Sequence, residues 1–118
     1  MANAIRTLEV QELRLTAAEA VVWLQDVPER RSETTEVRGR FVGPRCSGRS
    51  TVEVAYPLRP VPGGARGSGD LAMRVVIPEP SFWASQSPYQ YEGTVELWDE
   101  GKRCDVRQIT LRLGHSGS

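Results

Sequence analysis

Short runs in which apolar and polar residues alternate recur along the 118-residue sequence, and this period of two most constrains how the chain folds. In the run Leu71–Ile77, Leu71, Met73, Val75 and Ile77 share one face and Arg74 lies on the opposite face. A second run places Tyr91, Gly93, Val95 and Leu97 in one row and Trp98 in the other. Successive side chains of a strand point to opposite sides, so each run predicts a strand with one buried face. Strands of parallel sheets are apolar on both faces, so the pattern favours antiparallel sheets.

Six runs of this kind predict strands. Four lie at Ile5–Leu15, Thr35–Val42, Thr51–Leu58 and Leu71–Ile77, and two form a hairpin within Pro78–Leu113. The hairpin arms are joined by Asp99-Glu100-Gly101-Lys102, where the glycine suits a left-handed turn position. In the third run we expect one inward row, made of Val52, Val54, Tyr56 and Leu58.

Two of the runs change phase, and each change predicts a β-bulge, which inserts one residue and returns the apolar set to the core side. In Ile5–Leu15 the change falls near Gln11 and Glu12. In the return arm of the hairpin, Cys104 and Val106 are expected to point inward before the row shifts. The shifted row is Ile109, Leu111 and Leu113.

Two segments are less regular. Thr16–Val27 begins with the capping-box spacing of Thr16 and Glu19, which is typical of a helix, but its apolar residues also alternate as in a strand. The surrounding strands favour the second interpretation. Pro57–Asp70 carries three prolines and four glycines, so we expect a connection without a regular ladder.

Six strands, with Thr16–Val27 interpreted as a seventh, are separated by turn residues and predict an all-β fold, namely an immunoglobulin-like antiparallel β-sandwich of about seven strands. We expect residues 1–118 to form a single domain, with the tail 115–118 fraying. A small barrel is the alternative, because periodicity does not distinguish a closed sheet from two stacked sheets.

Charge and composition narrow the classes of partner. Fifteen basic and fifteen acidic residues balance, so the sequence predicts no nucleic-acid binding and no attraction to a membrane surface. No apolar run is long enough to span a bilayer, and Met1–Val10 lacks the pattern of a signal peptide, which predicts a cytoplasmic protein if Met1 is the native start. Cys46 and Cys104 stand apart, which favours two reduced, buried thiols over a metal site, with a disulfide as the alternative.

Several fixed proline, aromatic and glycine positions mark the last forty residues or so. The motifs are Ile77-Pro78-x-Pro80-x-Phe82-Trp83, Ser87-Pro88-Tyr89-x-Tyr91, Val95-Glu96-Leu97-Trp98, x-Gly101-x-x-x-Asp105 and Leu111-Arg112-Leu113-Gly114. Together they resemble the immunoglobulin-like domain that precedes the catalytic barrel in the β-galactosidase and β-glucuronidase family of glycoside hydrolases. The resemblance implies a sandwich fold and little chemistry, because the paired catalytic glutamates of that family lie in the barrel. Ala84-Ser85-Gln86 departs from the serine-proline-acid sequence usual there.

Four aromatic residues are candidates for binding. Phe82, Trp83 and Tyr89 would suit an aromatic platform for a sugar ring, although a hydrophobic plug at one end of the sandwich is the favoured interpretation. Trp98 is turned outward by strict alternation, which indicates either a contact surface for a partner or packing against Thr16–Val27, with Trp23 as its neighbour.

No catalytic site emerges from the sequence. Glu92 and Glu96 lie on one face of a strand at a separation of roughly 13 Å, too far for a glycosidase carboxyl pair. The one histidine, His115, lies near the end of the chain. The sequence thus predicts no enzyme, no metal and no cofactor. We expect a non-catalytic β-sandwich interaction module with a protein or carbohydrate partner, or alternatively a carbohydrate-binding or glycoside-hydrolase accessory domain.

Overall fold

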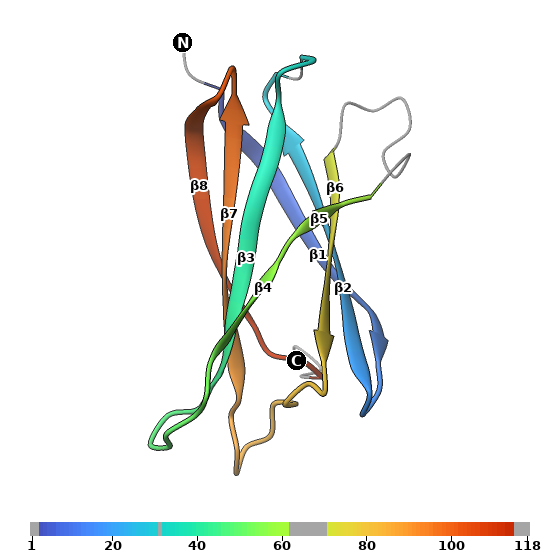
Figure 1. The fold of residues 1–118 in the computed structure, drawn as a ribbon, viewed down its shortest axis with the longest axis vertical. Helices are drawn as coiled ribbons and strands as arrows, with labels where there is room; N and C mark the ends of the chain where they lie inside the picture. The colour runs from blue at the N-terminus through green and yellow to red at the C-terminus, as the bar shows by residue number, and fades with distance from the viewer. Residues whose placement is uncertain (1–2, 31, 62–70, 115–118) are drawn as a thin grey trace.

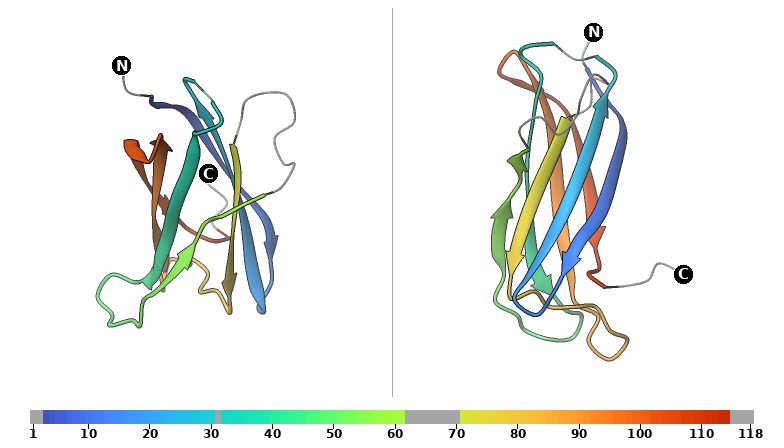
Figure 2. Two further views of the ribbon diagram at one scale, coloured as in Figure 1. Left: turned by 45° about the horizontal axis from the view of Figure 1, so that its top comes forward. Right: turned by 90° about the vertical axis from the view of Figure 1, so that its right-hand side faces the viewer.

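The computed structural model describes residues 3–30, 32–61 and 71–114, and this part of the chain forms eight strands in two facing sheets (Figures 1 and 2). The strands are β1 (Ile5–Leu15), β2 (Glu19–Pro28), β3 (Glu36–Arg45), β4 (Val54–Pro57), β5 (Arg59–Pro60), β6 (Leu71–Pro78), β7 (Gln90–Asp99) and β8 (Lys102–Leu111). One sheet has the order β1-β2-β6-β5 and the other β4-β3-β7-β8, all pairs being antiparallel.

This arrangement confirms the predicted antiparallel β-sandwich of immunoglobulin type and excludes the barrel. Four strands in one sheet face three in the other in the constant immunoglobulin arrangement, and here β4 is added beside β3 before the chain crosses to β5. We name the two layers sheet A (β1-β2-β6-β5) and sheet B (β4-β3-β7-β8). The uncertain segment Thr16–Val27 is the strand β2, as favoured by its alternation.

The core is made of the inward rows of the central strands. In β2 this row includes Ala20, Val22 and Leu24, and β6 and β7 supply the rows that the sequence predicts. Gly93 of β7 lies under the ring of Phe41, where an added Cβ would come within 2.5 Å of Phe41 Cε2. The inward row of β7 therefore has a glycine at the position where the ring of Phe41, on the neighbouring strand β3 of the same sheet, occupies the space.

The predicted inward row of Thr51–Leu58 is wrong at its beginning. Strand β4 starts only at Val54, and Val52 and Val54 are 85% and 46% exposed, whereas Leu58 is buried. Strand β4 lies at the edge of sheet B, where it pairs with β3 alone. Alternation persists at an edge, but burial also requires an opposing sheet, and at Val52 there is none to cover the side chain.

The bulge in β1 is confirmed, with a register shift between Glu12 and Arg14. The expectation that it returns the apolar residues to the core side is wrong for Val10, Leu13 and Leu15, which are 40%, 51% and 37% exposed on this edge strand, whereas Leu8 packs against the core. The bulge in β8 is also present but lies earlier than predicted. Leu97 pairs with Asp105 and Trp98 with Arg103, so Cys104 is the inserted residue. Val106 consequently points outward, and the predicted inward placement of Cys104 and Val106 is wrong.

The remaining predictions have mixed outcomes. Cys46 is buried and free, as expected, whereas Cys104 is free but only half-buried because it forms the bulge. Arg59–Pro60 pairs with β6, so a short ladder exists at the start of the segment expected to have none. The rest of that connection and the tail 115–118 lie outside the described residues.

Candidate binding surfaces

Trp98 lies on the outer face of sheet B, as alternation predicts, and it is held there by two neighbours. The guanidinium carbon of Arg38 lies 4.1 Å from the centroid of the indole ring, a cation–π contact. The indole Nε1 donates a hydrogen bond of 3.1 Å to Glu96 Oε1. Since Trp98 is in sheet B and Trp23 is in sheet A, the alternative in which the two pack together is wrong.

Glu96 connects Trp98 to the next strand. Its Oε2 pairs with Arg103 Nη1 of β8 at 3.2 Å, and Arg38 pairs in turn with Glu36 of β3. The indole hydrogen bond, followed by the hydrogen bond and charge of Arg103, holds the pKa of the Glu96 carboxyl below its usual value. We call the five residues Glu36, Arg38, Glu96, Trp98 and Arg103 the Trp98 face. It combines an aromatic ring with charges of both signs.

The aromatic loop between β6 and β7 lies at the end of the sandwich opposite the β7–β8 turn (Figure 1). The Trp83 amide donates to the carbonyl of Leu113 at 2.9 Å, and Trp83 forms an isolated bridge with Pro88. Trp83 and Tyr89 are half-buried, and Phe82 is 36% exposed and lies near Gly114. These contacts attach the loop to the segment after β8, which is what a plug requires. A sugar platform at this loop stays a prediction.

The carboxylates of Glu92 and Glu96, the pair considered in the sequence, contact different partners. Glu92 accepts hydrogen bonds from Thr110 and Gln90, while Glu96 is engaged by Trp98 and Arg103. His115 lies outside the described residues. Within residues 3–30, 32–61 and 71–114, no three side chains of His, Cys, Asp or Glu come together in a way that could hold a metal ion. The same ranges contain no helix with the length and apolarity needed to cross a bilayer.

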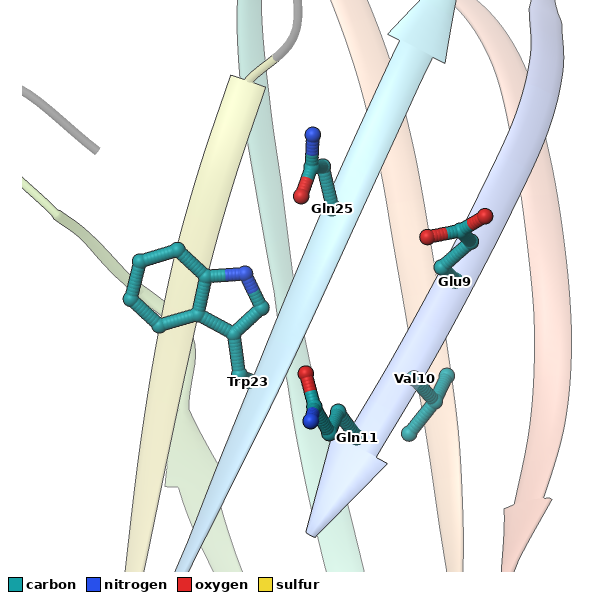
Figure 3. Close-up of a pocket in the computed structure, with 5 residues that line it drawn as sticks. All are labelled: Glu9, Val10, Gln11, Trp23 and Gln25. Atoms are coloured by element: carbon teal, nitrogen blue, oxygen red, sulfur yellow. The ribbon is translucent and has the colours of Figure 1, made fainter. Parts of the chain in front are cut away.

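A groove that the sequence reasoning missed lies on the outer face of sheet A. It has a volume of about 350 Å³ and is lined by Glu9, Val10, Gln11, Trp23 and Gln25, and we call it the Trp23 groove. Figure 3 shows the indole projecting from β2, with the side chains of Gln11 and Gln25 beside it and Glu9 on β1. The strict alternation of β2 was the available signal, because Leu24 points inward and its neighbour Trp23 must point outward.

A buried carboxylate was also missed. Asp26 occupies the inward row of β2, is only 1% exposed, and neither carboxyl oxygen has a hydrogen-bond partner in the part of the chain that the structure describes. Burial raises its pKa from 3.8 to about 6, partly opposed by the positive charge of Arg107 and reinforced by the negative charge of Asp105. Arg107 and Asp105 lie on the inward side of β8, because the bulge at Cys104 turns these two residues inward and Val106 outward.

Asp105 and Arg107 join the edges of the two sheets. The amide of Ile5 donates to Asp105 Oδ2 at 2.8 Å, and Arg107 Nη2 donates to the Ile5 carbonyl at 2.7 Å. The first residue of β1 is therefore clamped to β8 by two side chains. This use of charged side chains explains why the first part of the inward row of β8 could not be recognised by its apolarity, whereas Ile109 and Leu111 face the core as predicted.

No protein-family model matches the chain, and no curated protein matches it by sequence. Solved structures match it in three dimensions. A β-glucuronidase of Bifidobacterium dentium, in complex with coumarin-3-O-glucuronide, matches 95% of this chain with a TM-score of 0.63 and 18% identity. A β-glycosidase of Bacteroides vulgatus matches 95% of this chain with a TM-score of 0.61 and 12% identity. A glycosyl hydrolase family 2 member of Bacteroides cellulosilyticus matches 94% of this chain with a TM-score of 0.59 and 18% identity.

The shared feature is the fold. The chain spans only 13% to 18% of the length of these enzymes. The resemblance carried by the last forty residues is thus confirmed as a likeness in fold to one part of family 2 glycosidase chains, and the match extends over both sheets of the sandwich.

Proposed function

We propose that the chain is a non-catalytic β-sandwich interaction module of the kind that accompanies a glycoside hydrolase, and that it contacts a polypeptide partner through the Trp98 face. The observation that carries this proposal is the match of nearly the whole chain to a small part of each glycosidase. A cytoplasmic location stays a prediction that depends on Met1 being the native start.

The composition of the Trp98 face supports a protein partner. Tryptophan and arginine are the residue types most enriched among those that carry binding energy at protein interfaces. Here Arg38 and Glu96 hold the indole in one orientation, so little side-chain entropy is lost when a partner covers it. Oppositely charged groups around the ring would give such a contact its register.

Two experiments test the proposal. The purified chain is incubated with p-nitrophenyl β-glucuronide and p-nitrophenyl β-galactoside, and we expect no release of p-nitrophenol above the buffer rate. Steady turnover that Glu96→Gln abolishes would show a catalytic chain and contradict the proposal.

The partner is sought by affinity purification from the organism that encodes the chain, comparing wild type with Trp98→Ala and with the matched control Thr94→Ala, on the same face of β7. We expect a co-purifying polypeptide that Trp98→Ala loses and Thr94→Ala retains. A polypeptide retained equally by both variants would place the contact elsewhere and overturn the assignment of the Trp98 face.

A further inference from the structure

We propose that the Trp23 groove is a saccharide-binding site whose ligand is an oligosaccharide lying along the outer face of sheet A. This inference goes beyond the docking role proposed for sheet B and does not depend on it. It also differs from the aromatic loop considered in the sequence, because none of Phe82, Trp83 and Tyr89 lines the groove.

The register of β1 and β2 brings the four polar and aromatic side chains of the groove into a compact array. Gln11 pairs with Trp23 and Glu9 pairs with Gln25, and all four point to the outer face. Paired residues of neighbouring strands lie about 5 Å apart and successive outward residues of one strand lie about 7 Å apart. The array therefore offers one indole, two primary amides and one carboxylate, and Figure 3 shows the indole lying over β6, with Glu9 across β2 on β1.

These side chains match the two surfaces of a sugar. A pyranose presents a patch of C–H groups that stacks on an aromatic ring, and around its rim it presents hydroxyl groups that both donate and accept hydrogen bonds. Primary amides donate and accept, and a carboxylate accepts two hydrogen bonds, so together they suit neighbouring hydroxyls. Among the described residues that line the groove, the one charged side chain is the carboxylate of Glu9, while Arg74 of β6, the cross-strand partner of Trp23, lines the adjoining hollow. An acidic and a basic group side by side suit a neutral ligand better than a phosphate-rich one such as nucleic acid.

The shape of the face indicates a chain of sugars. A second hollow of about 410 Å³ follows the Trp23 groove along the same strands, and Val21, Arg74 and Val76 are among its lining residues. Val21 is the next outward residue of β2 before Trp23, and Val76 pairs with it from β6. Val76 is 40% exposed, so some apolar surface continues beyond the indole, beside the charged side chains of Arg14, Glu19 and Arg74 that also line this hollow. An oligosaccharide with one ring on Trp23 would place its next ring over this surface.

The first experiment is affinity electrophoresis of the full chain through gels containing hydroxyethylcellulose, arabinoxylan, galactan, galactomannan or polygalacturonate. We expect at least one polymer to slow the wild-type chain, and Trp23→Ala to restore the mobility measured without polymer. Trp98→Ala, which removes the outward indole of the opposite sheet, is the matched control and should be slowed like wild type. The absence of retardation in every gel would overturn the proposal, and so would retardation that Trp23→Ala leaves unchanged.

The second experiment locates the site within the folded protein. The chain has three tryptophans, so its indole N–H groups give three signals in a proton–nitrogen correlation spectrum, and the signal missing in Trp23→Phe is that of Trp23. Oligosaccharides of increasing length, cut from the retarding polymer, should shift the Trp23 signal, with the longer ones binding about tenfold or more tightly than a monosaccharide. Shifts confined to the signals of Trp83 or Trp98, or no shift at all, would overturn the assignment.

These outcomes are separable from those of the docking proposal. Trp23→Ala tests the outer face of sheet A, whereas Trp98→Ala tests the outer face of sheet B. Gln11→Ala provides a second variant of the groove that keeps the indole, and it should weaken binding while leaving the fold and the Trp23 signal in place. If Gln11→Ala binds like wild type, the amide has no part in recognition and the proposed chemistry of the groove is wrong.

Discussion

Asp26 makes the stability of this protein depend on pH in a direction opposite to that expected for most carboxylates. Its folded-state pKa is raised from 3.8 to about 6, mainly by burial, with Arg107 opposing and Asp105 adding to the rise. The folded state therefore holds a proton that the unfolded state has released between these two values. Stability contributed by the neutral form is complete below pH 3.8 and is lost as pH rises through about 6.

The size of the effect follows from the two pKa values. A rise from 3.8 to about 6 corresponds to a loss of about 3 kcal/mol of unfolding free energy between acid and neutral pH. Asp26→Asn has nearly the same shape and cannot ionise, so it should avoid this loss. We expect the two proteins to differ by roughly 1 kcal/mol or less near pH 4, since a neutral carboxyl and an amide bury comparable polar groups. The variant should be the more stable one at about pH 7.5.

The measurement is urea unfolding followed by tryptophan fluorescence at several values between about pH 4 and about pH 8, and the quantity of interest is the difference between variant and wild type. Carboxylates that do not interact with Asp26, including Glu96 with its lowered pKa, titrate equally in both proteins and cancel in that difference. Glu100→Gln, which removes a carboxylate of the exposed hairpin turn, is the control for the loss of one negative charge. A difference for Asp26→Asn that does not grow from acid to neutral pH would refute the reasoning.

Three further substitutions probe the same core. Gly93→Ala should destabilise the fold by about 1 to 3 kcal/mol in urea unfolding, because the new methyl meets the ring of Phe41. Tyr91→Phe should cost about 1 kcal/mol, since the hydroxyl accepts a 3.0 Å hydrogen bond from the Ser81 amide; an unchanged urea midpoint would show that water replaces it. Arg107→Gln removes the charge that lowers the pKa of the buried β2 carboxyl, so the stability lost on going to neutral pH should increase, and a smaller loss than in wild type would contradict the assignment.

The inward faces of the central strands were predictable because the facing sheet covers the apolar side chains that alternation places together. The inward rows of β6 and β7 are as predicted, and so are the outward positions of Arg74 and Trp98. At the edge of sheet B the same reasoning failed for Val52, since alternation says which residues share a face and not whether anything covers that face.

In β8 and just beyond it, the predicted inward row of Ile109, Leu111 and Leu113 is confirmed, but the inward residues of the first half of the strand were not predictable from apolarity. A bulge at Cys104 moves Asp105 and Arg107 to the inward side, where the chain uses them to hold Ile5 of β1. A sequence-based assignment that searches for apolar residues selects Val106 instead, one position away. Charged residues that face inward at the rim of a sandwich satisfy backbone groups of an edge strand, and only the register reveals them.

The candidate sites show the same limit for aromatic residues. Alternation turns Trp23 and Trp98 outward equally, yet the structure gives them different surroundings. An arginine covers the ring of Trp98 and a carboxylate accepts its N–H, whereas Trp23 lies in a groove between amide side chains. These neighbours come from cross-strand register, which hydrophobic pattern alone does not specify for polar positions.

The two tryptophans lie on outer faces of opposite sheets, and this separation makes the two proposals independent in a way that can be measured. Facing sheets of a sandwich are about 10 Å apart, and the core between them is filled, so a ligand on Trp23 does not touch a partner on Trp98. A saccharide bound to sheet A should therefore leave the affinity of a polypeptide for sheet B unchanged. If saturating saccharide alters that affinity, the coupling must pass through the packed core. The most direct route is through Leu24, the buried residue that lies between Trp23 and Gln25 in β2.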